Sequence, residues 1–495
     1  MAAAYGRARP AVIAVACQPE NMPMTQLDEV RDALAARMSS HRADLEALVR
    51  IPSVSASGYD PGQVRRAAVA VAELCTRRGL EHARLLEVEG SHPAVAADLL
   101  HAASDAPTVL LYAHHDVQPA GDPASWASAP FEPTERNGRL YGRGVADDKA
   151  GVLVHVAAVD AWLQAHGQLP VNVKLLIEGE EETGSAHLGD FLARYADELR
   201  ADVIVVTDST NWKVGTPAIT YLLRGLVDCV VELRALEHPV HSGMYGGPVP
   251  DALTALTKLL GGLTDDHGAV AIPGFADDVR APTARERERL DALDFDEGAF
   301  RGEAGMRPGV ALTGDPAASV LERLWMRPTV TVIGIDAPSV AASSNTLAAV
   351  ARARLSLRLA PGQDPQRAQR VLAEWLRAST PWGLELGVTA GAAAGAFVAD
   401  PDDPVFAAAE RALGRAYGAD VVYQGIGGSI PLLGPLSRAF TTDPARPTPA
   451  LLTGVEDPDT RAHGTDESLH LGDWQRACLA EAYLFAELAT NGGAR

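Results

Sequence analysis

Apolar residues in the first part of the chain form short solid runs that alternate with amphipathic segments. Runs of strand length lie at 107–113, 171–177 and 201–208. Apolar residues recur at helical spacing at 28–49, 151–167 and 185–200. Continuous apolar strands that alternate with helices predict a parallel sheet covered by helices on both faces.

The pattern changes after about residue 216. Segments 226–236 and 351–361 alternate apolar and polar residues, which is typical of strands with one exposed face, and 251–263 has helical spacing between them. A charged stretch rich in Pro and Gly, 273–310, predicts loops and short helices. From about residue 394 the earlier pattern resumes.

The fold class predicted from this change is α/β with an insertion. A larger domain with a mostly parallel sheet is expected to use residues 26–216 and 394–495, and residues 217–393 are expected to form a smaller inserted α+β domain. A chain of 495 residues with 47% hydrophobic content is long enough for two such cores, because single cores stop growing at roughly 250–300 residues. Residues 1–25 are expected to form a disordered leader, with a short secretion signal as the alternative.

Charge and cysteine content limit the classes of binding partner and the cellular compartment that are expected for the protein. The net charge of -21 argues against nucleic acid and anionic membranes, since both are bound by clustered Lys and Arg. No apolar run approaches the ~18–20 residues of a membrane span. The four cysteines lie far apart without metal-binding or disulfide spacing, so a reducing cytoplasm is the expected location.

Acidic and histidine residues follow all three predicted parallel strands. His114, His115 and Asp116 follow the first strand, the glutamates 180–182 follow the second, and Asp208 closes the third. Open α/β sheets place their ligand crevices at the carboxyl ends of such strands. Imidazole and carboxylate groups gathered there predict a site for zinc, manganese or cobalt.

Each of these segments also has an ordinary interpretation when it is taken alone. His114 and Asp116 could be turn residues, although strand alternation would let Asp116 hold the imidazole of His114 while its other nitrogen binds a metal. Asp147 and Asp148 could cap a helix, and the glutamates could form a solvated acidic turn. Asp147 and Asp148 would repel a phosphate, and their Gly-rich segment lacks the phosphate-loop pattern.

Seven short motifs nevertheless occur in one order along the chain. They are HHDVQP (114–119), YGRGVADDKAG (141–151), EETGS (181–185), TD (207–208), HSGMYGG (241–247), GGSIP (427–431) and AHGTDE (462–467). In this order they resemble the M20 family of metallopeptidases, most closely its carnosinase-like dipeptidase branch. The resemblance spans roughly residues 28–490.

The resemblance implies a site with two metal ions. The implied ligands are His114, Asp147, Glu182, Asp208 and His463. Asp147 would bridge the ions, and Glu182 and His463 would stand on opposite metals. Glu181 would be the general base and Asp116 would orient His114.

The resemblance also implies that residues 217–393 form a lid and dimerisation domain. His241 would reach the active site, often that of the partner subunit, to stabilise the oxyanion. The implied substrate-binding residues are Asn345, Arg358, Gly428 and Ser429. Arg358 suits a two-pronged grip on the C-terminal carboxylate of a peptide.

Four positions depart from the family pattern or have no role in it. Gly425 and Ile426 stand where many relatives have a charged pair, so the substrate loop there is expected to differ, and Ala150 is a mild change between Lys149 and the following glycine. Lys149 is expected to pair with nearby carboxylates. Glu180 has no assigned role and is expected to be solvated and tolerant of substitution.

The function expected from these features is hydrolysis of the amide bond of dipeptides or other short peptides. Two divalent ions per subunit would activate a water for Glu181, with zinc as the first expectation and manganese or cobalt also compatible. One alternative is a deacylase or desuccinylase of N-acyl amino acids, and a second is a metal-binding protein without catalysis. A homodimer formed through the lid domain and a short-peptide substrate are the expected partners.

Overall fold

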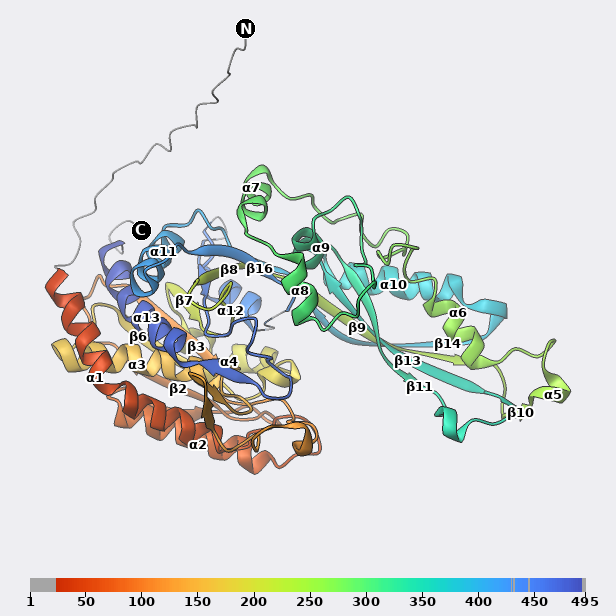
Figure 1. Ribbon diagram of the computed structural model, residues 1–495, viewed down its shortest axis with the longest axis horizontal. Helices are drawn as coiled ribbons and strands as arrows, with labels where there is room; N and C mark the ends of the chain where they lie inside the picture. The colour runs from red at the N-terminus through yellow and green to blue at the C-terminus, as the bar shows by residue number, and fades with distance from the viewer. Residues whose placement is uncertain (1–23, 429, 431, 444–445, 492–495) are drawn as a thin grey trace, which may run out of the picture.

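The computed structural model describes residues 24–491 apart from 429, 431 and 444–445 (Figure 1). The first helix, α1 (Met24–Val49), already includes residues 24 and 25, which had been assigned to the leader. The remainder of the expected leader lies outside the described residues. Among the described helices, none is long and apolar enough to cross a membrane.

The larger sheet has nine strands and a parallel centre. Its strands are β1 (Glu81–Leu86), β2 (Ala94–Leu99), β3 (Thr108–His114), β6 (Asn172–Glu178), β7 (Val203–Val206), β8 (Ala218–Leu223), β15 (Phe397–Val398), β16 (Val422–Ile426) and β17 (Ala450–Leu452). They run in the order β1-β2-β6-β3-β7-β17-β8-β15, with β16 also paired to β8. β6, β3, β7 and β17 are mutually parallel, and the outer pairs β1–β2, β2–β6, β17–β8 and β8–β15 are antiparallel.

Helices cover both faces of this sheet, as its solid apolar strands require. One face packs on α1, α2 (Pro61–Arg77), α3 (Lys149–His166), α11 (Pro404–Tyr417) and α13 (Leu471–Asn491). The other face packs on α4 (Leu188–Leu199) and α12 (Leu433–Phe440). Alternate residues of β3 enter the two cores, Val109 and Leu111 on one side and Leu110 and Tyr112 on the other.

A second, four-stranded sheet lies beside the first (Figure 1). It is antiparallel, in the order β11 (Thr329–Asp336), β13 (Val350–Leu359), β9 (Gly225–Arg234) and β14 (Glu385–Ala394). Helices α6 (Ala252–Leu260) and α10 (Pro365–Ser379) cover one face and build a separate core with it. The charged stretch 273–310 carries the short helices α7 (Ala284–Ala292) and α8 (Glu297–Glu303).

The chain crosses between the two sheets at two adjacent places. It leaves the larger sheet through Arg224 between β8 and β9, and it returns after β14 to β15. The crossings touch, because a side-chain carbon on Gly225 would meet Ala394 O at 2.6 Å and Ala396 N at 2.8 Å. Glycine is therefore the residue that lets the two connections lie side by side.

The predicted α/β fold with a mostly parallel central sheet is confirmed. The expected start of the insertion at residue 217 is too early, because β8 is buried throughout and belongs to the larger sheet. An apolar strand directly after a polar loop gives no sign of which sheet it joins. The role of the second sheet as a lid and dimerisation domain stays a prediction.

Candidate active site

The predicted metal ligands come from five separate segments. His114 ends β3, Glu182 lies in the short helix η2 (Glu181–Thr183) after β6, and Asp208 follows β7. Asp147 precedes α3, and His463 lies in the loop before β18 (Ser468–His470). The parallel pairing of β6, β3 and β7 brings the first three strand ends to one edge of the sheet.

His114, Asp147 and Asp208 form the first group of possible ligands. The Nε2 atom of His114 lies 3.1 Å from Oδ1 of Asp147 and 3.9 Å from Oδ2 of Asp208. One donor atom from each of the three residues lies within 4.8 Å of the others, which is close enough for a shared ion.

Asp147, Glu182 and His463 form the second group. The Nε2 atom of His463 lies 3.0 Å from Oδ2 of Asp147 and 3.1 Å from Oε2 of Glu182. Asp147 therefore directs one oxygen to each group, as a bridging carboxylate would. Glu182 and His463 approach one another directly, so the expectation that they stand on opposite metals is wrong: this geometry gives them the same ion.

Carboxylates crowd this site strongly enough to shift one another's pKa. Burial and the nearby charges of Asp147 and Glu182 raise the pKa of Asp208 to about 7, against the lowering effect of His114. Burial, with Asp208 and Glu182, raises the pKa of Glu181 well above its usual range. The hydrogen bonds of Asp147 and Glu182 raise the pKa of His463 to about 11. The carboxylates of the site thus carry more negative charge than the two histidines can neutralise. Bound divalent cations would offset the excess.

The donor set fits divalent metal ions. Each group offers imidazole nitrogen and carboxylate oxygen, the ligand types that zinc, manganese and cobalt accept. A histidine that binds metal usually gives its other ring nitrogen to an oxygen acceptor. The Nδ1 atom of His114 lies 3.1 Å from the backbone oxygen of Asp116 and 3.4 Å from its Oδ1, which leaves Nε2 directed at Asp147 and Asp208.

Asp116 is a hub that connects both sides of the site. Besides lying against His114, its carboxylate accepts hydrogen bonds from the backbone N–H groups of Glu181, at 3.3 Å, and Glu182, at 3.1 Å. The hydroxyl of Ser55 donates to it at 2.6 Å. Asp116 therefore positions the turn that carries Glu181 as well as His114. Ser55 had no assigned role, and only its place in an extended Ser-Val-Ser segment before a helix marks it in the sequence.

Glu467 was also missed, although it ends the last motif. Its buried carboxylate accepts from Nη1 of Arg143 at 2.6 Å and from the backbone N–H groups of Gly144, Ala146 and Asp147 at 2.9, 3.0 and 3.2 Å. These bonds tie the loop before α3 to the segment that carries His463, so Glu467 sets the spacing of two ligands.

Glu180 is not solvated, contrary to expectation. Its side chain is 7% exposed and accepts from the backbone N–H of His187 at 3.0 Å, from the ring Nδ1 of His187 at 3.0 Å and from the backbone N–H of His92 at 3.4 Å. The run of three glutamates thus divides into one that faces the protein and two that face the site. Strand alternation could not have suggested this division, because it would place Glu180 and Glu182 on the same side.

Lys149 does not pair with carboxylates. Its buried ammonium group donates to the backbone oxygens of Leu48, at 3.0 Å, and Ile51, at 2.7 Å, where α1 ends. Burial lowers its pKa to about 7. The carbonyls at a helix C-terminus are acceptors that a sequence motif does not reveal.

The residues predicted to bind substrate lie on the second sheet and on one loop of the larger one. His241, in β10 (Val240–His241), and Asn345 lie together at the far tip, where β10 pairs with β12 (Thr346–Leu347) (Figure 1). Both are exposed, and the structure does not bring them to the metal ligands of the same chain. Arg358 lies near the opposite end of that sheet, and Gly428 follows β16. Ser429 lies outside the described residues.

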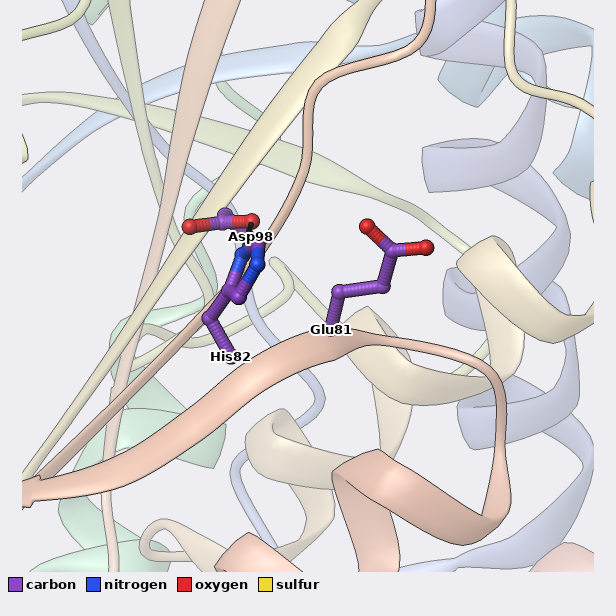
Figure 2. A group of neighbouring side chains, drawn as sticks. All are labelled: Glu81, His82 and Asp98. Atoms are coloured by element: carbon purple, nitrogen blue, oxygen red, sulfur yellow. Dashed lines mark hydrogen bonds and ion pairs between the residues drawn. The ribbon is translucent and has the colours of Figure 1, made fainter.

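A further group of possible ligands, Glu81, His82 and Asp98, lies at the edge of the sheet on β1 and β2 (Figure 2). His82 Nδ1 lies 2.8 Å from Asp98, and Glu81 reaches Nε2 of His101 at 2.9 Å. These side chains satisfy one another at an exposed edge, so the strand-end groups around Asp147 are the better metal site.

Comparison with known proteins shows the family to which the chain belongs. The sequence pattern of peptidase family M20/M25/M40 matches residues 110–487, which include all five candidate ligands. The chain belongs to this family. It is accordingly an enzyme of the M20 metallopeptidase type, a class that binds divalent metals, usually two.

Several relatives of this M20 peptidase carry names of dipeptidases. It is 36% identical over 380 residues to the cysteinylglycine-S-conjugate dipeptidase of Corynebacterium striatum, covering 76% of this chain and 80% of that one. It is 28% identical over 481 residues to the Cys-Gly metallodipeptidase of Candida albicans, covering 93% and 96%. Human carnosine dipeptidase 1 superimposes with a TM-score of 0.81 at 26% identity, covering 94% of this chain and all of that one.

The comparisons confirm the expected family, fold and enzyme class of this M20 peptidase. The roles of individual residues, the identity of the metal, the homodimer and the cytoplasmic location stay predictions.

Proposed function

We propose that this M20 peptidase hydrolyses the amide bond of dipeptides and other short peptides at a site with two divalent metal ions. The observation that carries the proposal is the position of Asp147, whose two oxygens face two separate ligand groups. His114, Asp147 and Asp208 would hold one ion, and Asp147, Glu182 and His463 the other. When bound, the ions lower the pKa of water and polarise the scissile carbonyl, as the two-ion sites of aminopeptidases do.

Glu181 is the general base in this proposal. Its neighbour Glu182 is a ligand, and both backbone amides are held by Asp116, so the carboxylate of Glu181 is fixed one residue from an ion. Glu181 takes a proton from the attacking water and gives it to the leaving amine. Positioned acid–base groups of this kind contribute typically ~10²–10⁴-fold to the rate. The raised pKa of Glu181 supports a group able to carry that proton.

The second sheet supplies the remaining contacts in the proposal. His241 donates to the developing oxyanion, and Asn345, Arg358, Gly428 and Ser429 bind the substrate. His241 is exposed in β10, which lies at the far tip of the smaller sheet, away from β3 (Figure 1), so the proposal assigns it to the site of a partner subunit.

A homodimer through the second sheet is part of the proposal. Its edge strand β11 carries exposed apolar side chains, among them Ile333 at 55% and Ile335 at 46%, and Met244 near His241 is 76% exposed. Unpaired strand edges with apolar side chains favour association. An Ile333→Lys variant is expected to weaken the dimer in analytical ultracentrifugation.

A substrate panel tests the proposal. The metal-loaded protein is incubated with dipeptides and with N-acyl amino acids, with and without a chelator, and zinc, manganese and cobalt are compared. We expect chelator-sensitive cleavage of dipeptides, and a Glu181→Gln variant that binds the same amount of metal but loses at least ~10²-fold in kcat.

Three other results would contradict parts of the proposal. Cleavage of N-acyl amino acids with no dipeptide turnover would favour the deacylase alternative. Metal binding without turnover of either class would favour a protein that only binds metal. Near-normal turnover by Glu181→Gln would remove Glu181 from the role of base.

A further inference from the structure

Arg224 occupies the connection through which the chain leaves the larger sheet for the smaller one. The residue is 7% exposed. Its guanidinium group donates to groups on both sides of the connection. Nε donates to the backbone oxygen of Gly427, in the loop after β16 of the larger sheet, at 3.4 Å. Nη1 donates to the backbone oxygen of Arg327 and to the hydroxyl of Thr329, both at 3.4 Å, at the start of β11 in the smaller sheet.

Strand register places Arg224 beside Arg358. On β13, Arg358 lies directly opposite Leu226 of β9 and directly opposite Thr329 of β11. Directly opposed residues direct their side chains to the same face, and so do residues two apart along a strand. Arg224 is two residues from Leu226 and binds Thr329, so Arg224 and Arg358 share one end of one face. That face is the one opposite helices α6 and α10, whose core takes Val227 and Leu357 instead.

The third nitrogen of Arg224 points to the glycine loop. A side-chain carbon on Gly427 would lie 2.7 Å from Nη2 of Arg224, so the guanidinium group occupies the space that a side chain there would fill. Among the described residues, the structure gives Nη2 no hydrogen-bond acceptor. Nη2 therefore lies beside Gly427, with no acceptor among the described residues.

The two arginines make an electropositive site. The acceptors of Arg224 are backbone carbonyls and a hydroxyl, none of which carries a charge. Burial, together with the nearby charge of Arg358, lowers the pKa of Arg224 to about 10. A partly buried guanidinium whose acceptors among the described residues are all uncharged is costly, and a nearby anion would lower that cost.

We infer that Arg224 is a second substrate-binding arginine, which donates through Nη2 to the terminal carboxylate that Arg358 also binds. This inference rests on the proposed peptidase function and deepens it, because it names peptides with a free C-terminal carboxylate as the preferred class. Arg224 is a specificity-determining residue in this role. Its bonds to Gly427 and Thr329 hold its guanidinium group in place across both sheets.

Kinetics with L-alanylglycine and its C-terminal amide test the role of Arg224. The wild type, Arg224→Lys, Gly427→Ala and the control Arg354→Ala are compared as metal-loaded full chains. Gly427→Ala keeps the charge but pushes Nη2 away from the loop. Arg354→Ala is the harsher control, because it removes a whole positive charge farther along β13, where Arg354 pairs with Asp228.

The expected result is a selective loss of affinity. We expect KM for the free acid to rise about 10- to 100-fold in both test variants, with kcat changed less and with less than about a threefold change for the amide. The control should keep the preference of the wild type for the acid. If the role of Arg224 were merely structural, kcat/KM would fall alike for the acid and the amide. Circular dichroism with urea unfolding identifies a variant that has not folded.

Two contrary outcomes are distinguishable. If the wild type cleaves alanylglycine and both folded variants keep its preference for the acid over the amide, the inference about Arg224 is overturned while the proposed function stands. If the wild type cleaves no dipeptide in any metal, the proposed function fails and the inference fails with it.

Discussion

Replacement of Glu180 by alanine should destabilise the protein, although the glutamate belongs to a run that looks like a solvated acidic turn. Its carboxylate holds three N–H groups from two segments, the two of His187 at 3.0 Å and that of His92 at 3.4 Å. Hydrogen bonds to a charged group contribute about 1.5–3 kcal/mol each, and such contributions are not additive. With two good bonds and one at the distance limit, we expect a loss of ~2–4 kcal/mol in the free energy of unfolding.

The same substitution should also lower activity. Glu181 and Glu182 directly follow Glu180, and the turn that holds them closes on the backbone oxygen of Glu180 through the N–H groups of Thr183, at 3.2 Å, and Ser185, at 3.0 Å. When the turn loses its anchor to His187, the base and one metal ligand lose their fixed position. We expect kcat for a dipeptide to fall at least about tenfold.

Urea unfolding followed by circular dichroism, together with steady-state kinetics, measures both effects. Glu89→Ala is the matched control, because Glu89 is an exposed glutamate close by in the sequence, and its side chain makes no hydrogen bond within the part of the chain that the structure describes. Glu180→Gln should fall between the two, since its amide keeps one acceptor oxygen. If Glu180→Ala matches the control within about 0.5 kcal/mol and keeps full kcat, the burial and bonding of this glutamate have been misjudged.

Other predictions address the ligands, the oxyanion and pH. His463→Ala should lose about one metal ion per chain in elemental analysis, and unchanged stoichiometry would refute its role as a ligand. His241→Ala should lower kcat about 10²–10³-fold with a smaller change in KM, since its contact forms mainly in the transition state, and an effect confined to KM would contradict this. Burial acts to raise the pKa of Glu286, but bonds from Arg280 lower it to about 2, below the unfolded value of 4.5. Its stabilisation is therefore complete above about pH 4.5 and is lost as the pH falls toward 2. The difference in melting temperature between the wild type and Glu286→Gln should shrink over that window, and a constant difference would argue against this ion pair.

The parallel centre of the fold could be read from the sequence because its strands are buried on both faces. The solid run at 107–113 became β3 with a shift of one residue, since hardly any other structure accommodates so many consecutive apolar residues between turns. Strand β8 is equally apolar, but pattern alone does not assign a strand to one of two sheets, so the start of the insertion was placed before it.

The candidate ligands were predictable because chemistry and strand ends coincide, while their grouping was not. Motif order named Asp147, Glu182 and His463, but only coordinates bring His463 to Glu182. Ser55 and Glu467 act through hydrogen bonds to residues far away in the sequence, and no local spacing reveals such bonds. Lys149 was misjudged because its partners are backbone oxygens, and Glu180 because two of its three donors are backbone N–H groups, which the sequence does not mark.

The strands on which the chain departs from the larger sheet and returns to it are hydrogen-bonded neighbours, with Leu223 opposite Phe397 and Leu222 opposite Val398. Opposed α-carbons of an antiparallel pair lie about 4.5–5.5 Å apart, a gap that a two-residue turn can close. In the topology of the larger sheet, β8 and β15 therefore form a hairpin, and residues 224–396 are its loop. Both ligand groups lie outside that loop, so the region from 224 to 396 could be replaced without loss of a ligand, provided that the replacement fills the part of the larger core that Leu321 and Trp325 now occupy.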